Sequence, residues 1–446
     1  MDSDDIIYLF TLVLSIGLGY FFQRIENPVK KKWFATVSGF LIVFCVTRFH
    51  SLHAIVLTLL IGHIIKYVSP RYCHATSFLF GFAYLIFFRM TEYFGIPYPT
   101  GHANMIQMIL TLKLIGLAFE VHDNVTIMKK VKDESIEVSN EDLYREFQNP
   151  TMVDVFHYAF CYAGLLTGPY FTYRTYCDMF LYAKNEQKLC FKESLKTLAY
   201  VPLFMSLFLA TSWTFPLERL HSANFYTETS FFYRLWYMYP TFFIFRMRMY
   251  IAFKLSEAVC MMAGLGLYPA DTKPKLGIGP TTNFHKLELL KRSPIEAYSF
   301  EAIRTINIFR CEFCSTVREA TRHWNRSIHY WLAAYVYHRF PFKNQRTLVT
   351  FFISSLWHGM HAGYYFSLFS VPLYLLVENS FKKRVLKDNS SKINNFILWN
   401  AKMFQFSYWG LAFQVKNYAD VWKYGTSVFL MPYIVAAAMY VCSMVT

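Results

Sequence analysis

Apolar runs of near-spanning length recur along almost the whole chain, and this pattern restricts the fold more than any other feature. A helix that crosses a bilayer needs about 20 predominantly apolar residues. The runs that meet or approach this length lie at residues 6–23, 33–49, 51–68, 76–95, 102–120, 153–171, 197–215, 231–253, 256–268, 323–340, 347–378, 396–414 and 424–445. They predict an all-α, polytopic integral membrane protein with about ten to twelve membrane helices. The pattern also predicts that residues 1–446 form a single membrane-embedded domain with polar loops near 121–150 and 269–300.

Several of these runs are short or interrupted. The run at 347–378 is long enough for a broken helix or two short ones, and Gly168-Pro169 interrupts the run at 153–171. Irregular backbone at membrane depth is tolerated only where it is buried in protein or lines a cavity. We therefore expect these segments to be buried within the protein or to line a cavity.

The basic residues lie in short clusters beside the apolar runs. The formal net charge of +15 would by itself suit a nucleic-acid partner. The clusters at 30–32, 129–130 and 382–384, however, are placed where loops would face anionic lipid headgroups. The chain is also 55% hydrophobic and only 16% charged. These features exclude a nucleic-acid-binding protein and predict the bilayer as the partner of the charges.

Two polar side chains stand inside apolar runs near the C-terminal end of the chain. Asn325 follows Trp324 in TRHWNRSIHYWL, and His358 stands between Trp357 and Gly359 in FFISSLWHGMHAGYYFSLF. A polar or ionisable group is costly to hold in hydrocarbon without partners, so it marks a functional site by default. The pair therefore predicts a polar cavity within the membrane.

These two side chains suit acyl transfer to a hydroxyl group. A neutral imidazole can act as a general base, an effect worth about 10²–10⁴-fold in rate. An Asn amide can donate to a developing oxyanion and accept from an incoming hydroxyl. No Ser or Cys stands in a nucleophile-elbow motif, so direct transfer is simpler than an acyl-enzyme. The opposing interpretation is that His358 is a satisfied core or interfacial residue, and that Trp324 and Trp357 are only packing groups.

Three arginines are candidates for contact with a substrate phosphate. Arg246 and Arg248 lie in the apolar run YPTFFIFRMRMYIAF, and Arg174 lies in TGPYFTYRTY. A guanidinium group binds phosphate in a bidentate manner, although a long basic side chain can also simply reach the membrane interface. Cys311 and Cys314 form a lone CxxC without a second pair, so we expect no metal site and no redox cofactor.

Several motifs follow one another along the chain in a specific order. They are LLTGPYFTYRTY, FFIFRMRMYIA, HWNRSIHYWLAAYVY with its WN pair, and WHG followed by GYY in SSLWHGMHAGYYFSLFSVPLYLLVE. Their order and spacing resemble the membrane-bound O-acyltransferases, and within that family the lysophosphatidylinositol acyltransferase branch. One departure is Ala362, which stands where the branch has Pro. That change loosens the local turn and leaves the chemistry untouched.

The resemblance implies a multi-pass enzyme of the endoplasmic-reticulum membrane. It would transfer a polyunsaturated acyl chain, such as arachidonoyl, from acyl-CoA to the sn-2 hydroxyl of lysophosphatidylinositol. His358 would be the base and Asn325 would position or polarise the reacting groups, with Trp324, Trp357 and Tyr364 against the substrates. The acyl-CoA would be a co-substrate entering from the cytosol, and the lysolipid would enter sideways from the bilayer. No cofactor is implied.

Two alternatives stay open from the sequence. One is a lysophospholipid acyltransferase for a choline, ethanolamine or serine headgroup, because headgroup choice depends on a few pocket contacts. The other is a transporter for a lipid or an organic anion. A transporter of that kind predicts repeated halves with broken helices in corresponding positions, and we find no internal repeat in the sequence.

Overall fold

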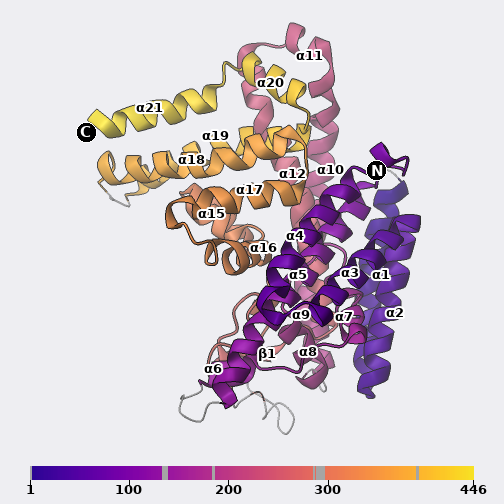
Figure 1. The fold of residues 1–446 in the computed structure, drawn as a ribbon. Helices are drawn as coiled ribbons and strands as arrows, with labels where there is room; N and C mark the ends of the chain where they lie inside the picture. The colour runs from indigo at the N-terminus through magenta and orange to yellow at the C-terminus, as the bar shows by residue number, and fades with distance from the viewer. Residues whose placement is uncertain are drawn as a thin grey trace. The chain divides into compact units, whose positions relative to one another are not determined.

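The computed structural model is mostly helical, with one short two-stranded sheet (Figure 1). The residues that it describes are 3–132, 139–182, 186–284, 287, 297–387 and 391–445. The chain divides into two compact units, each assembled from separate stretches. The first unit contains Met1–Ala199, Ala252–Thr305 and Arg326–Trp331, and the second contains Tyr200–Ile251, Ile306–Asn325 and Leu332–Thr446. The helical class is confirmed, and the single membrane-embedded domain stays a prediction.

The first unit is built around the N-terminal helices. Its helices are α1 (Ser3–Arg24), α2 (Pro28–Thr47), α3 (Ser51–Tyr67), α4 (Pro70–Arg89), α5 (Gly101–Lys132), α6 (Asn140–Arg145), α7 (Met152–Ala159), α8 (Tyr173–Tyr182), α9 (Gln187–Leu198), the end of α12 (Phe231–Met262) and most of α16 (Arg326–Leu332). Its short 3₁₀ turns and strands are η1 (Arg48–His50), η2 (Thr91–Phe94), β1 (Tyr268–Pro269), η4 (Ala270–Thr272), β2 (Tyr298–Ser299) and η5 (Glu301–Ile303). The antiparallel strands pair Tyr268 with Ser299 and Pro269 with Tyr298.

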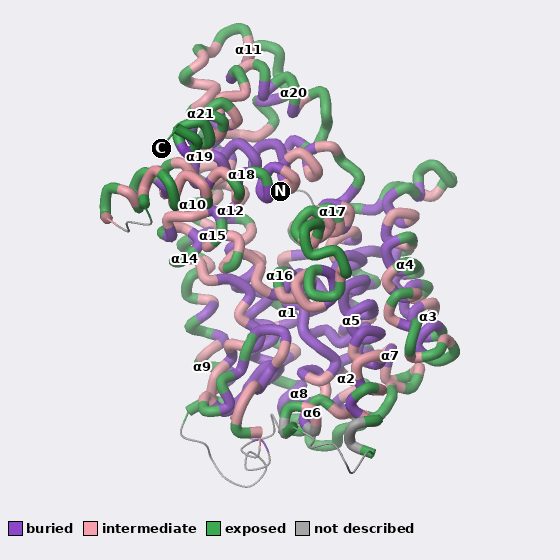
Figure 2. Tube along the Cα trace, turned by 60° about the vertical axis from the view of Figure 1, so that its left-hand side comes forward, coloured by how far each residue is buried: buried purple, intermediate pink, exposed green. Residues whose placement is uncertain are grey.

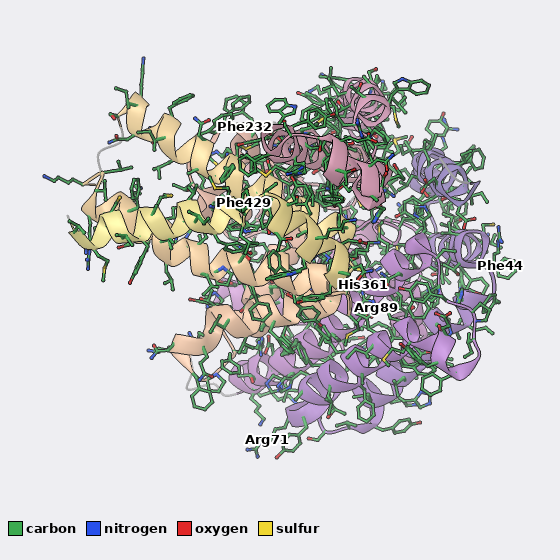
Figure 3. All side chains as sticks on the ribbon, turned by 90° about the horizontal axis from the view of Figure 1, so that it is seen from above. Phe44, Arg71, Arg89, Phe232, His361 and Phe429 are labelled. Carbon is green, nitrogen blue, oxygen red and sulfur yellow. The ribbon has the colours of Figure 1, made fainter. Side chains whose placement is uncertain are left out.

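Local sequence signals explain how these helices begin and which faces they bury. At the start of α2, the Asn27 side chain accepts hydrogen bonds from two free backbone N–H groups, and Pro28 occupies the first helical turn. Helix α5 is largely buried, with α2, α3, α4 and α7 packed against it (Figure 2). Outer helices instead expose large apolar side chains. Phe44 of α2, for example, is 54% exposed and lies at the edge of the first unit (Figure 3), as expected for a face in contact with lipid.

The second unit holds the C-terminal helices. Its elements are α10 (Val201–Thr214), η3 (Leu217–His221), α11 (Ala223–Glu228), the first part of α12, α14 (Ile308–Phe313), α15 (Val317–His323), the π-helical turn η6 (Ala333–Tyr337), η7 (Lys343–Gln345), α17 (Arg346–His358), α18 (Ala362–Arg384), α19 (Lys392–Val415), α20 (Tyr418–Ser427) and α21 (Met431–Val445). Helix α18 packs against α17, α19 and α21, which run beside it in Figure 1. Buried aromatic residues contribute to the core of this unit, among them Tyr237 of α12, Tyr374 of α18, and Tyr408 and Trp409 of α19.

Fewer helices qualify as membrane spans than the apolar runs predict. In the described part of the chain, the helical segments that are long and apolar enough are Asp4–Arg24, Pro28–Tyr67, Gly101–Lys129 and Gln187–His221. The pair α20 and α21, bent by 64°, adds a fifth if it is one broken span. The structure therefore supports a multi-pass membrane protein and does not confirm ten to twelve membrane helices. One reason is that several apolar runs are divided into helices too short to cross a bilayer alone.

The boundaries of several elements differ from the hydropathy pattern. The run at 231–253 and the first part of the run at 256–268 form the single helix α12, which ends at Met262, because Lys254, Ser256 and Glu257 interrupt the hydropathy without breaking the backbone. Conversely, the run at 323–340 is broken near its start, and the run at 347–378 becomes α17 and α18. Helix α5 continues to Lys132, into the predicted polar loop at 121–150. Part of the second predicted polar loop, 269–300, lies outside the described residues.

A glycine brings the start of α18 against the end of α19. The Gly363 N–H donates to the Lys416 carbonyl oxygen at 2.8 Å. A Cβ atom on Gly363 would lie 2.3 Å from the Ala412 carbonyl oxygen. Because that neighbour is backbone, it cannot move aside as a flexible side chain would. The contact requires glycine and fixes the last turn of α19 beside the first turn of α18.

We expect Gly363→Ala to destabilise the protein by about 1–3 kcal/mol, because the added methyl overpacks a backbone contact. Thermal unfolding of the detergent-solubilised protein, followed by intrinsic fluorescence, should show a lower Tm. Gly17→Ala in α1 is the matched control, since a Cβ there meets nothing within 4 Å and alanine favours a helix. Equal melting of Gly363→Ala and the unmodified protein would contradict the close contact.

Candidate active site

Asn325 lies in a two-residue break between α15 and α16. The Trp324 N–H donates to the Ala320 carbonyl oxygen at 2.9 Å and closes α15. Asn325 then adopts a φ of 38°. Asn enters this left-handed region more readily than most residues, because its short polar side chain can hydrogen-bond locally. The residue type that can contact a reacting oxygen is therefore also one that suits the backbone of the turn.

His358 is the last residue of α17, where the following glycine ends the helix. The Gly359 N–H donates to the Ser355 carbonyl oxygen at 3.0 Å. Gly359 itself has φ 148° and ψ −173°, a conformation that is essentially restricted to glycine. The carbonyl end of a helix carries roughly half a negative elementary charge. His358 is thus placed where the local field stabilises the imidazolium that forms when a base takes up a proton.

Two phenylalanines connect the histidine to the asparagine turn. The Trp324 ring stacks on Phe245 of α12 with ring centroids 6.1 Å apart, and Phe245 lies 5.7 Å from Phe413 of α19. Phe413 meets the His358 imidazole edge to face at 4.9 Å. We call Trp324, Phe245, Phe413 and His358 the aromatic bridge. The aromatic bridge therefore connects the Trp324–Asn325 turn to the end of α17 within the second unit.

The other predicted aromatic residues join the same group. Tyr364, in the first turn of α18, lies 4.6 Å from Phe413 and 5.9 Å from His358 between ring centroids. Trp357 is buried and its ring lies 4.8 Å from that of His358. The structure thus connects the predicted residues His358, Trp357 and Tyr364 directly, and Trp324 through Phe245 and Phe413; Asn325 follows Trp324 in the chain.

Phe245 and Phe413 are the members that the sequence analysis missed. Phe245 stands directly before Arg246 in the motif FFIFRMRM, but that motif contains three phenylalanines, and nothing in the sequence distinguishes one from the others. Phe413 lies in an ordinary apolar run. One phenylalanine among 46 carries no signal of its own. Only the packing of α12 and α19 selects these two.

The groups expected to carry the chemistry are accessible in part. The Asn325, His358 and Tyr364 residues are each half-buried, so a substrate can reach them. His361, three positions beyond His358, is exposed at the start of α18 (Figure 3). Its ring contacts that of Tyr364 at 5.8 Å. The half-buried histidine is therefore better placed than its neighbour to act in a protected cavity.

Arg246 is held by an acidic residue of α14. Its Nη1 donates to Glu312 Oε2 at 2.8 Å, and the Tyr250 hydroxyl donates to Glu312 Oε1 at 2.5 Å. The guanidinium group also lies over the Phe242 ring at 4.6 Å. Tyr250 in turn contacts the Trp324 ring at 6.0 Å. Arg246 therefore helps fix the wall beside the asparagine turn, and its predicted contact with phosphate stays a prediction.

The two remaining arginines lie in different settings. Arg248 is exposed on α12. Arg174 belongs to the first unit, where its Nε lies 3.2 Å from Asp178 Oδ1 in an ion pair without linear hydrogen-bond geometry. Burial raises the pKa of the Asp178 carboxyl. The Arg174 charge and hydrogen bonds from two tyrosine hydroxyls act in the opposite direction and partly offset that increase. The phosphate contacts proposed for Arg248 and Arg174 likewise stay predictions.

Comparison with known proteins identifies the class. The sequence profile of the membrane-bound O-acyltransferase family matches residues 88–413, a stretch that contains Asn325, His358 and the whole aromatic bridge. The chain belongs to the membrane-bound O-acyltransferase family, a family of acyltransferase enzymes.

Its similarity to individual relatives extends over nearly the full length. The chain is 38% identical to the membrane-bound acylglycerophosphatidylinositol O-acyltransferase of Drosophila melanogaster, over 98% of this chain and 92% of that protein. Proteins of the same name from Xenopus laevis and Homo sapiens are 35% and 33% identical. The Xenopus match covers 99% of this chain and 93% of the relative, and the human match covers 98% and 93%.

We expect Glu312→Ala to lower the Tm clearly, because it leaves the Arg246 charge buried without its carboxylate. Breaking a buried pair costs about 3–5 kcal/mol, and the 21% exposure of the Glu312 side chain places it at the lower end. Replacing both partners by methionine should recover most of the loss, since no lone charge remains. Glu228→Ala, at an exposed helix end, is the control. Independent, additive losses would contradict a pairwise interaction.

Proposed function

We propose that this protein transfers an acyl group from acyl-CoA to the sn-2 hydroxyl of lysophosphatidylinositol and so remodels phosphatidylinositol. The observation that carries the proposal is the aromatic bridge, which links His358 at the end of α17 to the Asn325 turn. The names of the relatives support the lipid acceptor, since each is an acylglycerophosphatidylinositol O-acyltransferase. A general base and an amide donor are the groups that attack of a hydroxyl on a thioester requires.

The proposed reaction is a direct transfer. The neutral His358 imidazole removes the proton of the sn-2 hydroxyl while its oxygen forms a bond to the thioester carbon. Asn325 donates to the carbonyl oxygen as negative charge develops on it, or orients the incoming hydroxyl. The carbon–sulfur bond then breaks, the imidazolium returns its proton to the leaving thiolate, and free coenzyme A departs. The helix end behind His358 stabilises the imidazolium between these two proton transfers.

The remaining parts of the proposal follow from the family. The acyl donor is a polyunsaturated acyl-CoA such as arachidonoyl-CoA, which acts as a co-substrate, and the reaction needs no cofactor. The enzyme works in the endoplasmic-reticulum membrane, with about ten to twelve membrane segments around a central chamber. Acyl-CoA enters from the cytosol and the lysolipid enters from the bilayer. Trp324, Trp357 and Tyr364 form part of the chamber wall.

We expect His358→Ala to abolish coenzyme A release while the protein still folds, because the base is lost. Asn325→Ala should lower kcat at least tenfold, because removing one oxyanion donor commonly costs about 10²–10³ in rate. His338→Ala, an exposed histidine at the end of η6, should remain active. Activity of His358→Ala equal to that of the unmodified protein would remove this residue from the mechanism. A change confined to KM in Asn325→Ala would make Asn325 a binding residue.

The acceptor can be tested with purified protein in detergent. Arachidonoyl-CoA is supplied with lysophosphatidylinositol or with the choline, ethanolamine or serine lysolipid, and coenzyme A release is measured. We expect release with lysophosphatidylinositol and much slower release with the others, because a pocket that binds the ring hydroxyls of inositol would leave its polar groups unpaired with the other headgroups. Preference for another lysolipid would keep the chemistry and overturn the headgroup. No release with any acceptor would overturn the enzymatic proposal.

A further inference from the structure

The segment that carries Trp324 and Asn325 is made of two very short helices. Helix α14 has six residues and α15 has seven. Isolated helices of fewer than about 12–15 residues are marginal even with favourable sequences. Such helices depend on contacts from outside for their position. The orientation of the asparagine turn at the end of α15 is therefore decided by whatever holds α14 and α15.

A buried lysine of α19 holds the end of α14. Lys402 is fully buried, and its Nζ donates to the carbonyl oxygens of Cys314 at 2.6 Å, Glu312 at 3.0 Å and Cys311 at 3.2 Å. An ammonium group has three N–H donors, so this one is saturated. The three acceptors are carbonyls at the C-terminal end of α14, which the helix itself leaves free. Trp399 Nε1, from the preceding turn of α19, also donates to the Glu312 carbonyl at 2.7 Å.

A buried glutamate of α18 holds the start of α15. Glu378 is only 4% exposed, and its two carboxylate oxygens accept from the Val317 N–H at 2.7 Å and the Arg318 N–H at 3.3 Å. The Thr316 hydroxyl accepts from the Glu319 N–H at 3.2 Å. Most of the free N–H groups at this helix end are thus satisfied from inside the unit. A carboxylate at a helix start and an ammonium at a helix end both match the helix dipoles.

We propose that Lys402 and Glu378 are positioning residues for catalysis, which set the Trp324–Asn325 turn by fixing the two helices that lead to it. The two residues come from the neighbouring helices α19 and α18, and α19 also supplies Phe413 to the aromatic bridge. One pair of long helices therefore controls both sides of the site. This inference rests on the proposed function, since it concerns the placement of Asn325 during acyl transfer.

We expect loss of either charged group to displace the Trp324–Asn325 turn while most of the protein still folds. Without the ammonium, the three carbonyls lose their shared donor and α14 can tilt, because burial denies them water. The large apolar core of the second unit contains no residue of α14, although it includes Val317 of α15. A displacement of about 1 Å in a reacting group can cost about 10²-fold in rate. The expected effect is therefore on kcat, with KM for acyl-CoA little changed.

The test is a double-mutant cycle with Asn325. Coenzyme A release by the purified, detergent-solubilised protein is measured for the unmodified chain, Lys402→Met, Asn325→Ala and the double variant, each normalised to folded protein by size-exclusion chromatography. We expect Lys402→Met to lower kcat at least tenfold when Asn325 is present and less than twofold when it is alanine. Such non-additivity indicates that the lysine acts through the asparagine. A purely structural role predicts the same factor in both backgrounds, and that result would overturn the proposal.

Control variants separate the remaining outcomes. Lys392→Met removes an exposed lysine from the start of the same helix and should leave kcat unchanged. Lys402→Arg keeps the charge and several donors and should restore part of the rate. If Lys402→Met does not fold, the cycle is run with Glu378→Gln, which keeps one acceptor oxygen, removes the charge and replaces the second acceptor by an amide NH2 group that cannot accept from the backbone. An inactive unmodified protein would refute the proposed function, whereas an active protein with an additive cycle would refute only the positioning role.

Discussion

The burial of charge at the ends of two short helices is the constraint on which the candidate site depends. Lys402 and Glu378 are both buried, and each is satisfied by backbone groups of α14 or α15. A charged side chain in such a setting is tolerated only when its hydrogen-bonding capacity is used. The same requirement that keeps these groups paired also fixes where the two helices end. The position of Asn325 is a consequence of that arrangement.

The histidine is placed by a different device, a forced helix end. Gly359 takes a backbone conformation that other residues rarely adopt, so α17 stops with His358 at its carbonyl end. Gly363 then lets α18 start in backbone contact with α19, whose Phe413 touches the imidazole ring. The glycines of the WHG and GYY motifs therefore determine the backbone conformation, while the other residues of these motifs supply the polar and aromatic side chains. A base at a helix C-terminus gains stabilisation of its protonated form during the reaction.

Much of the helical fold could be predicted from the sequence, whereas the catalytic roles assigned to its polar groups stay predictions. Apolar runs and their interruptions indicated the helical membrane class, and polar groups inside those runs singled out Asn325 and His358. The break within 347–378 was expected as well. The continuity of α12 was not, because hydropathy fell at 254–257 while helix formation continued. Arg246 was predicted to contact a phosphate or to reach the membrane interface, and that prediction stays open; what the sequence did not indicate is its ion pair with Glu312 of a distant segment. Sequence spacing gives no means of pairing those two residues.

The sequence by itself determined which side chains were available and where helices end, because the length of an apolar run and the conformational preferences of glycine and asparagine are local properties. It also determined the family, through motifs spread along the chain. Only the tertiary structure decided which phenylalanines join His358 to the asparagine turn, and which lysine and glutamate hold that turn. Those choices depend on contacts between α12, α18, α19 and the short helices α14 and α15. Contacts of this kind arise from the packing of helices far apart in the chain, which no local pattern encodes.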